Sequence, residues 1–391
     1  MTTTVNNEHK NIKVPNLRFK EFQGEWISRT IGDIAPLQRG FDLPTGQICN
    51  GKIPVVYSNG IMNHHSSYKC VAPGLVTGRS GTIGKFTYIE DGYYWPHNTS
   101  LWVTDFHDNN PKFIHYLYQT IHIEQYSTGS GVPTLNRNYV HRHKTFIPKL
   151  KEQNKIAAFL SLLDERIATQ NKIIDRLQSL IKGLEDNLLD NPLWEKTYLR
   201  SFMQFFSTNS LSWEQLSYEE GEIRNLHYGL IHGFQTRGIN SASLPMIKNE
   251  AIPKQYTLCQ VGDVAFADAS EDTSEIAKSV EFADTIEGDT ICGLHTIHGR
   301  DIKNRTVVGF KGFAFNSRYF HNQIKRLAQG TKVFSITANN LSSCYVYLPD
   351  FDTQKAIVKL LKAYEEKLLV SKRLLEQYEK QKQYLLRQMF I

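Results

Sequence analysis

The sequence predicts an α+β protein with two mixed, strand-rich domains and two long antiparallel helices that form a coiled-coil spacer between them. Three observations predict this architecture. The segment "IPKLKEQNKIAAFLSLLDERI", which begins at Ile147, recurs in divergent form as "LPDFDTQKAIVKLLKAYEEKL", which begins at Leu348. Both copies place apolar residues at alternating steps of three and four, as coiled-coil helices do. The sequence before each copy has short β-branched and aromatic runs between Gly, Asn and Asp, which indicates strands and turns.

These observations divide the chain into four segments. We expect strand-rich domains at residues 1–147 and 192–348, and long helices at residues 148–191 and 349–391. A proline stands at the start of each predicted helix, where it ends the preceding extended segment. The stretch "DNPLW", which begins at Asp190, ends the first helix and opens the second domain. The predicted order is therefore domain, helix, domain, helix.

Each predicted helix carries one apolar stripe that must be buried. A helix of about 35 residues is roughly 50 Å long, and the matching stripe of the sister helix is a suitable partner. A dimer that exchanges helices between two chains would satisfy the same stripes. The expected seam consists of Ile156, Leu160, Leu163, Ile167, Ile174 and Leu177 in the first helix and of Leu361, Tyr364, Leu368, Leu375, Tyr378 and Leu385 in the second.

Composition narrows the class of protein. With 391 residues, 40% of them hydrophobic, the chain is long enough for two or three domains with hydrophobic cores. Its five cysteines lie far apart without a CxxC pair, which argues against a disulfide framework or a zinc ribbon and favours reduced thiols in a cytoplasmic protein. The N-terminus has no apolar signal segment and no apolar run approaches 18 residues, so we expect neither secretion nor membrane insertion.

Two similar domains on a long spacer suit the recognition of a repeating polymer. At 3.4 Å per base pair, a 50 Å spacer corresponds to about 15 base pairs of duplex DNA. Residues 1–150 carry 15 basic and 10 acidic side chains, whereas residues 191–347 carry 15 and 16. A mildly basic chain permits a polyanion as partner. We therefore expect a DNA target with two half-sites and an unread gap.

Several stretches, taken in order, resemble one known family. They are "VPNLRFKEFQGEWISRTIGDIA", "GLVTGRSGTIGKF", "GSGVPTLNRNYV" leading into "FIPKLKEQNKIAAFLSLLDERI", "GDVAFADASED" and the C-terminal repeat. Together they resemble the DNA-recognition, or specificity, subunits of bacterial type I restriction-modification systems. The resemblance covers nearly the whole chain.

The resemblance implies a division of labour within a complex. Each domain would be a target-recognition domain that reads one half of a split DNA sequence. The helices would set the gap and bind two methyltransferase subunits, which methylate adenine N6. Restriction subunits, which are ATP-driven translocases and nucleases, would join that core. The chain itself would supply sequence choice, without catalysis and without a cofactor.

The residues themselves give no enzyme motif. The stretches "DNPLW" and "NNPKF" lack the second proline of the adenine methyltransferase motif D/N-P-P-Y/F, and "GRSGTIGKF" does not fit the phosphate-binding pattern GxxxxGK[ST]. The acids Asp350 and Asp352 are absent from the sister copy, so helix capping explains them better than a nuclease site does. We expect no catalytic residue. A coiled-coil scaffold that does not read DNA is the first alternative function, and a self-sufficient methyltransferase or nuclease is the second.

Metal binding is not expected either. The three histidine pairs lack cysteine or carboxylate partners at the spacing that metal sites use. Surface or hydrogen-bonding roles explain these pairs better. They are His64 with His65, His141 with His143, and His295 with His298.

Candidate DNA contacts in the first domain lie on glycine-rich and basic loops, where backbone N–H groups and cations can approach phosphates and side chains can reach base edges. Tight structural turns and solvated basic loops have the same sequence pattern. The candidates are Arg79, Ser80, Lys85, His97, Asn98, Arg137, Arg142 and Lys144.

The second domain carries a different charge pattern, since "ADASEDTSE" is acidic. Asp268, Glu271 or Asp272 can accept a hydrogen bond from a cytosine amino group, although turn and capping roles are the better explanation for most of them. Tyr228 has core packing as its alternative. The candidates for DNA contact are Tyr228, His232, Gln235, Arg237, Lys278, Arg300, Lys303, Arg305 and Arg318.

Overall fold

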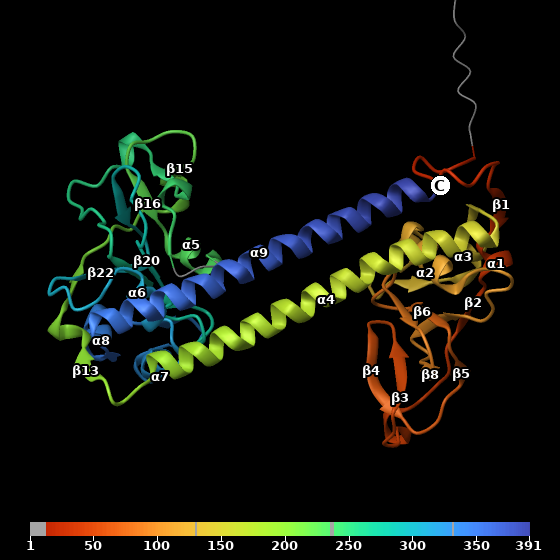
Figure 1. Ribbon diagram of the computed structural model, residues 1–391, viewed down its shortest axis with the longest axis horizontal. Helices are drawn as coiled ribbons and strands as arrows, with labels where there is room; N and C mark the ends of the chain where they lie inside the picture. Colours follow the sequence, from red (N-terminus) through yellow and green to blue (C-terminus); the bar gives the residue numbers. More distant parts are fainter. Residues whose placement is uncertain (1–12, 130, 235–237, 331) are drawn as a thin grey trace, which may run out of the picture. The chain divides into compact units, whose positions relative to one another are not determined.

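The computed structural model describes residues 13–129, 131–234, 238–330 and 332–391. The chain divides into two compact units, one of Met1–Gln170 with Leu374–Ile391 and one of Asn171–Arg373. Both boundaries fall within long helices, α4 (Leu150–Leu189) and α9 (Phe351–Met389). Each unit therefore contains one globular domain together with parts of both helices (Figure 1).

The first unit is built on two four-stranded sheets. One is antiparallel, in the order β2-β9-β6-β7, and the other has the order β4-β3-β8-β5 with β3 and β8 parallel. The first sheet consists of β2 (Leu37–Arg39), β9 (Ser100–Val103), β6 (Gly74–Gly78) and β7 (Phe86–Ile89). The second consists of β4 (Gly60–His65), β3 (Ile53–Tyr57), β8 (Tyr93–Pro96) and β5 (Cys70–Val71).

Helix α2 (Pro111–Thr120) packs on β6 and β7 and provides the aromatic core of this unit. Asn110 caps the helix, since its side chain accepts a hydrogen bond from the backbone N–H of Phe113. Phe113, Tyr116 and Tyr118 are fully buried. The smaller elements of the unit are α1 (Ile31–Ile34), β10 (Ser127–Thr128), β11 (Thr134–Leu135) and α3 (Arg137–His141).

The second unit repeats this arrangement. An antiparallel sheet has the order β14-β22-β18-β20, and a second sheet has the order β15-β17-β16-β21 with β16 and β21 parallel. The first sheet consists of β14 (Met203–Phe206), β22 (Thr296–Asp301), β18 (Val264–Ala267) and β20 (Ser279–Glu281). The second consists of β15 (Leu216–Ser217), β17 (Met246–Ile247), β16 (Arg224–Leu226) and β21 (Thr290–Cys292).

Short helices and a third small ribbon complete the second unit. They are α5 (Tyr228–Gly233), α6 (Phe310–Ala314), α7 (Arg318–Leu327), α8 (Ala338–Ser343) and the pair β19 (Ala269–Ser270) with β23 (Phe334–Ser335). The prediction of two mixed, strand-rich domains is confirmed. The structure adds what the residue pattern alone did not contain: the two antiparallel sheets share one strand order, and the second sheets share three strands, β4-β3-β8 and β17-β16-β21, while their edge strands β5 and β15 differ in place.

A two-stranded ribbon closes each domain just before its long helix. In the first unit β1 (Ile27–Thr30) pairs antiparallel with β12 (Lys144–Ile147), and in the second β13 (Glu195–Tyr198) pairs with β24 (Tyr345–Leu348). The first strand of each ribbon opens its domain and the second ends it. Both ends of each domain therefore lie side by side at the start of a helix.

The two long helices have 40 and 39 residues. Within the first unit, Ile156, Leu160 and Leu163 share a core with Leu385 and Met389. Within the second, α4 and α9 share a core through Leu184, Leu188, Ile357 and Leu361. The remaining predicted seam residues are buried or half-buried: Ile167, Ile174, Leu177, Tyr364, Leu368, Leu375 and Tyr378. Among the described residues, no helix combines the length and apolarity that a membrane span requires.

A buried glutamine fixes the first turn of each long helix. Gln153 donates from Nε2 to the Pro148 carbonyl (3.0 Å) and to Asn109 Oδ1 (2.9 Å), and its Oε1 accepts from the Asn110 N–H (2.9 Å). Gln354 does the same: it donates to the carbonyls of Pro349 (3.0 Å) and Arg305 (3.1 Å) and accepts from the Val307 N–H (2.9 Å). The repeat therefore extends from the helix faces to the joints between helix and domain.

We expect the Gln354→Leu variant to lose on the order of 3 kcal/mol of unfolding free energy, because the half-buried Val307 N–H and two carbonyls lose their partner. Urea unfolding followed by circular dichroism measures this loss. Gln381→Leu is the matched control, since Gln381 lies on the same helix with an exposed side chain. An equal loss in both variants would show that helix propensity, and not the joint, determines the effect.

Acid should weaken the first unit through a buried histidine. His115 lies between the rings of Tyr88 and Tyr116, and burial lowers its pKa to about 3, with help from the charge of Lys382. Because the folded pKa is below the unfolded value of 6.5, this stability is fully present above pH 6.5 and is lost as the pH falls towards 3.

The cost is about 2 kcal/mol at pH 5, since each pKa unit below 6.5 corresponds to 1.36 kcal/mol. Melting temperatures measured from pH 7.5 to 5 check this expectation. His115→Phe should flatten the decline, whereas substitution of the exposed His122 should leave it unchanged. A decline of undiminished slope in His115→Phe would exclude His115 as its cause.

The second unit contains a fully buried ion pair. Lys311 Nζ lies 3.0 Å from Glu281 Oε1, and the two side chains are 2% and 0% exposed. Glu281 also accepts hydrogen bonds from the backbone N–H groups of Gly309 (2.9 Å) and Gly312 (2.7 Å), and Lys311 donates to Thr306 Oγ1 (2.9 Å). The carboxylate thereby joins β20 to the start of α6.

Candidate nucleic-acid interface

Loops at one end of the first-domain sheets bring several predicted residues together. Arg79 follows β6 directly, and its Nη1 donates to the Asn98 carbonyl (3.5 Å). His97 Nδ1 lies 3.0 Å from Thr99 Oγ1, and its ring lies 4.2 Å from that of Tyr57. Burial lowers the pKa of His97, which favours the neutral ring that can both donate to and accept from a base.

The glycine-rich loop after β6 lies against the β3–β4 hairpin. A Cβ at Gly78 would lie 1.7 Å from the Thr82 carbonyl oxygen, so only glycine fits at this position. Lys85 Nζ donates to the Asn59 carbonyl (3.3 Å), and Ser80 forms a β-bridge with Thr134. We call the set Arg79, Ser80, Lys85, His97, Asn98 and Arg137 the first loop cluster.

The other two predicted residues of the first domain lie elsewhere. Arg142 follows α3, and Lys144 pairs with Thr30 in the ribbon β1–β12. Arg137, by contrast, donates to the Leu37 carbonyl (3.4 Å) and stands two residues after Leu135, whose N–H bonds to the Arg79 carbonyl. The structure therefore separates Arg142 and Lys144 from the first loop cluster.

The second domain gathers aromatic and charged side chains in a comparable place. Tyr228 packs edge-on against His295 (5.3 Å between ring centroids), and His295 Nδ1 lies 3.1 Å from Asp268 Oδ1. Lys278 Nζ donates to the His232 carbonyl (3.1 Å). Burial raises the pKa of Asp268, although His295 opposes that shift. We call Tyr228, His232, Asp268, Glu275, Lys278 and His295 the second loop cluster.

This cluster contains residues that the sequence did not single out as sites. Glu275 Oε2 lies 3.1 Å from Lys278 Nζ and 3.4 Å from His232 Nδ1. The sequence predicts a surface or hydrogen-bonding role for His295, and a turn or capping role as the better explanation for most of Asp268, Glu271 and Asp272. Their pairing with Tyr228 depends on contacts between distant segments, which residue spacing does not reveal. Gln235 and Arg237, also predicted here, lie outside the described residues.

The remaining basic candidates of the second domain take part in other contacts. Arg300 donates to both carboxylate oxygens of Asp263 (2.8 and 2.7 Å) and to the Leu258 carbonyl, which favours a structural role over DNA contact. Arg305 pairs with Glu195 (2.6 Å) beside the start of α9. Lys303 is exposed in the turn after β22. The structure thus separates these three from Tyr228.

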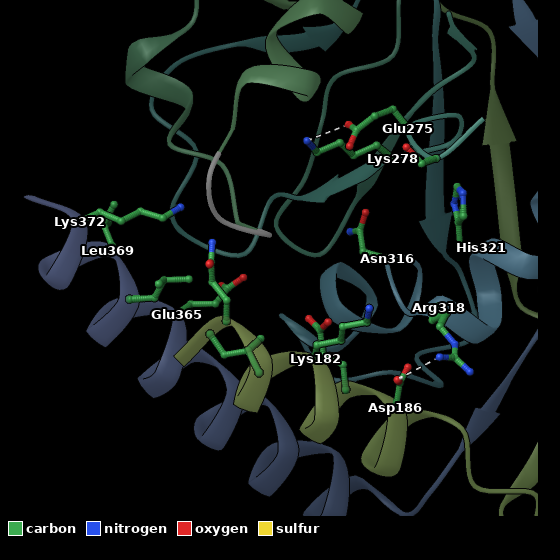
Figure 2. Close-up of a pocket in the computed structure, with 15 residues that line it drawn as sticks. Lys182, Asp186, Glu275, Lys278, Asn316, Arg318, His321, Glu365, Leu369 and Lys372 are labelled. Atoms are coloured by element: carbon green, nitrogen blue, oxygen red, sulfur yellow. Dashed lines mark ion pairs between the residues drawn. The ribbon is translucent and has the colours of Figure 1, made fainter. Parts of the chain in front are cut away.

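Arg318 lies in a cavity of the second unit. Its Nη1 is 3.8 Å from Asp186 Oδ2, and the cavity, of about 450 Å³, is also lined by Lys182, Lys278 and His321 (Figure 2). Charges of both signs face this space. Lys278 belongs both to the second loop cluster and to the lining of this cavity, so the two features are continuous.

Arg79 and Asp268 occupy the same position in the two domains. The Arg79 N–H donates to the Thr99 carbonyl (2.9 Å) and its carbonyl accepts from Leu135 (2.7 Å). The Asp268 N–H likewise donates to the His295 carbonyl (3.0 Å), and its carbonyl accepts from Ile336 (3.0 Å). Each residue follows the equivalent strand, β6 or β18. A cation in one domain therefore stands where the other has a carboxylate.

Comparison with known proteins now identifies the architecture. Residues 23–179 match the family model of the type I restriction modification DNA specificity domain. A putative type I restriction enzyme MjaX specificity subunit from Methanocaldococcus jannaschii is 26% identical over 261 residues, which are 64% of this chain and 59% of that protein. The MjaVIII specificity subunit of the same organism is 23% identical over 290 residues, 68% of this chain and 67% of its own length.

The fold agrees with solved structures over almost the whole chain. An S subunit of a type I restriction-modification system from M. genitalium aligns with a TM-score of 0.63 at 16% identity, covering 97% of this chain and 99% of that one. A chain from a structure of a type I system and its complex assembly aligns with a TM-score of 0.54 at 14% identity, covering 93% and 95%. The chain thus shares its fold with these two solved structures.

The specificity domain and the fold agree with each other. Residues 23–179 resemble the specificity domain, and the fold resembles that of a type I restriction-modification S subunit. The resemblance inferred from the sequence is confirmed, and a scaffold unrelated to DNA recognition is not favoured.

Proposed function

We propose that the chain is the sequence-specific DNA-recognition subunit of a type I restriction-modification complex and is itself not a catalyst. Each target-recognition domain, at residues 1–147 and 192–348, reads one half of a split target. The observation that carries this proposal is the repeated antiparallel sheet with a loop cluster at the same position in both domains. Arg79 suits a guanine and Asp268 a cytosine at that position.

The long helices, at residues 148–191 and 349–391, form the coiled-coil spacer and the docking surface for two methyltransferase subunits. Beside their buried seam, both helices have exposed apolar side chains, an arrangement that supports binding of a further protein. In α4 these are Phe159, Leu162, Ile173 and Leu180, and in α9 they are Leu360, Val370, Leu374 and Tyr384. Methylation of adenine N6 and ATP-dependent cleavage would belong to the partner subunits, in the cytoplasm.

Co-expression tests the proposal directly. The chain is expressed with its methyltransferase partner in a host that lacks adenine methylation, and N6-methyladenine is mapped across the genome. Methylation at one split motif, absent when either protein is omitted, supports the proposal. A stable complex without methylation would favour the scaffold, and methylation by this chain alone would contradict its non-catalytic role.

Shortening the two long helices is expected to shorten the unread gap between the half-sites. Deleting seven residues from α4 and seven facing residues from α9 shortens the helices by about 10 Å, or three base pairs. We expect both half-sites to keep their sequence while the gap shrinks or binding is lost. Methylome mapping of the variant measures this, and altered half-sites with the original gap would contradict the spacer.

A further inference from the structure

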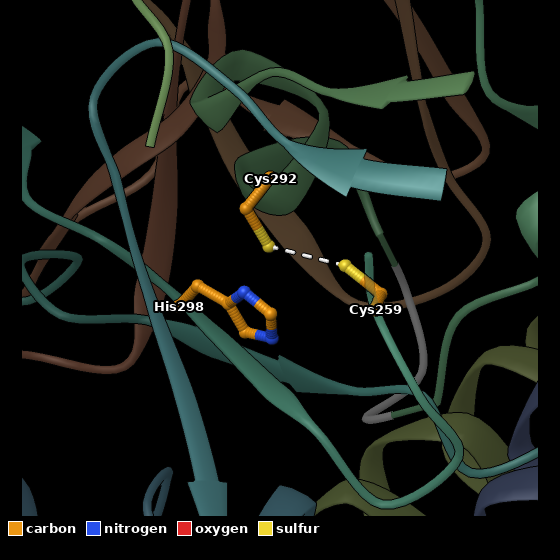
Figure 3. Close-up of side chains that lie close together, drawn as sticks. All are labelled: Cys259, Cys292 and His298. Atoms are coloured by element: carbon orange, nitrogen blue, oxygen red, sulfur yellow. Dashed lines mark hydrogen bonds between the residues drawn. The ribbon is translucent and has the colours of Figure 1, made fainter. Parts of the chain in front are cut away.

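Three side chains of metal-ligand type meet in the interior of the second domain. Cys259, Cys292 and His298 come from three separate segments, and one ligand atom of each lies within 4.8 Å of the others (Figure 3). The two sulfurs are 3.6 Å apart, and the residues are 8%, 3% and 1% exposed. None of the three residues belongs to the second loop cluster, since Cys292 lies on β21, His298 on β22 and Cys259 on the segment before β18.

The distances fit one cation of the zinc class. Zinc binds thiolate sulfur at about 2.3 Å in tetrahedral geometry, which places two ligating sulfurs about 3.8 Å apart. The observed separation of 3.6 Å differs from this value by a few tenths of an ångström. A disulfide would instead require the sulfurs to approach to about 2.05 Å.

The imidazole is oriented as a ligand. His298 Nε2 lies 2.7 Å from Asp263 Oδ2, so this nitrogen carries the proton and donates to the carboxylate, leaving Nδ1 as the free acceptor. Asp263 is fixed in turn by Arg300 (2.8 and 2.7 Å) and by the Gln260 N–H (2.8 Å). A carboxylate that holds the far nitrogen of a ligating histidine is the usual outer arrangement of protein zinc sites.

Charge and space also suit a divalent cation. Two thiolates and a neutral imidazole together with a divalent cation have a net charge of zero, which reduces the penalty of burying the ion. Cys292 and His298 line a cavity of about 150 Å³ together with Thr208, Tyr256 and Thr257. This volume is sufficient for a water molecule in the fourth tetrahedral position.

We propose that Cys259, Cys292 and His298 Nδ1 bind one zinc-class divalent cation that stabilises the second domain. Cys292 belongs to β21 in one sheet and His298 to β22 in the other, so the ion links the two sheets. Cys259 belongs to the segment before β18, and its backbone N–H donates a hydrogen bond to the Thr290 carbonyl. The expectation of no metal site, drawn from the spacing of His295 and His298, is thereby revised, because the cysteines approach His298 only in the folded chain.

The test measures metal in the full-length chain, purified under reducing conditions. Zinc content by mass spectrometry should be one ion per chain, and Co²⁺ added to the metal-free protein should give the charge-transfer absorption of a cobalt–thiolate centre. Cys292→Ser should abolish both. Cys344→Ser is the matched control, since Cys344 is a buried free cysteine of the same unit outside the cluster, and it should retain both.

Other outcomes overturn the proposal. Reduced wild-type protein that contains no zinc and shows no cobalt–thiolate absorption has only two hydrogen-bonded thiols at this place. A mass lower by two hydrogens in protein purified without reductant, together with absence of metal, would indicate a disulfide. Zinc retained in Cys292→Ser would place the metal elsewhere. The wild-type measurements decide the question even if the variant fails to fold.

Discussion

Replacing Lys311 by methionine is expected to lower the unfolding free energy of the second unit by about 3–5 kcal/mol. The substitution leaves the carboxylate of Glu281 fully buried without a counter-charge, and an unpaired buried charge strongly destabilises the folded state. Because whole domains have net stabilities of only about 5–15 kcal/mol, this loss removes a large fraction of the stability of the unit. Urea unfolding of the variant measures the loss.

Two further variants separate charge from packing. Lys325→Met removes an exposed lysine of the same unit and should change the unfolding free energy by less than about 0.5 kcal/mol. The double variant Lys311→Met with Glu281→Gln removes the unpaired charge and should be more stable than Lys311→Met alone. If the double variant were the less stable, the hydrogen bonds of Glu281 to Gly309 and Gly312 would outweigh the ion pair.

Replacing Arg79 by alanine is expected to weaken binding of the target DNA by about 10–100-fold, which corresponds to about 1–3 kcal/mol. This prediction rests on the proposed function. Arg79 follows β6 directly, and its guanidinium donates a long hydrogen bond to the Asn98 carbonyl at 3.5 Å, so other N–H groups remain available for a base. Binding of the assembled complex to its target and to single-base variants measures the effect.

The pattern of loss distinguishes base reading from phosphate contact. If Arg79 reads a base, Arg79→Ala relaxes the sequence preference at one base pair of the first half-site only. If Arg79 contacts a phosphate, the variant has lower affinity for all sequences alike. Arg29→Ala removes the same charge from an exposed position on β1 and should cause little change. Unchanged affinity in Arg79→Ala would remove this residue from the interface.

Periodicity explains why the helices were predictable. Alternating steps of three and four, seen at Ile156, Leu160 and Leu163, are a local property of the sequence, and the long helices follow from it. The strand-rich character of the domains is also local. Their shared strand order is not, because it depends on pairings between distant segments such as β3 with β8.

The candidate site residues also divide into those marked by a local sequence pattern and those that depend on contacts between distant segments. Loops marked by Gly, Asn and basic residues were found from sequence, and the structure gathers Arg79, His97 and Asn98 as one group. The role of Arg300 was missed because Asp263, its partner, is 37 residues away. The equivalence of Arg79 and Asp268 required knowledge of which strands correspond, although the 201-residue offset relates Leu135 to Ile336.

The ribbons that close the domains have a consequence for how such proteins diversify. Ile27 pairs with Ile147 and Glu195 pairs with Leu348, so each domain enters and leaves the helical framework at a single point. Exchange of the segment between these two points replaces the domain without changing the length of the helices, provided that the new domain keeps the apolar contacts that the old one makes with them, such as those of Phe113 in the core that contains Ile156 and Leu160. Under the proposed function, one such exchange would supply a new half-site while the helices keep their length.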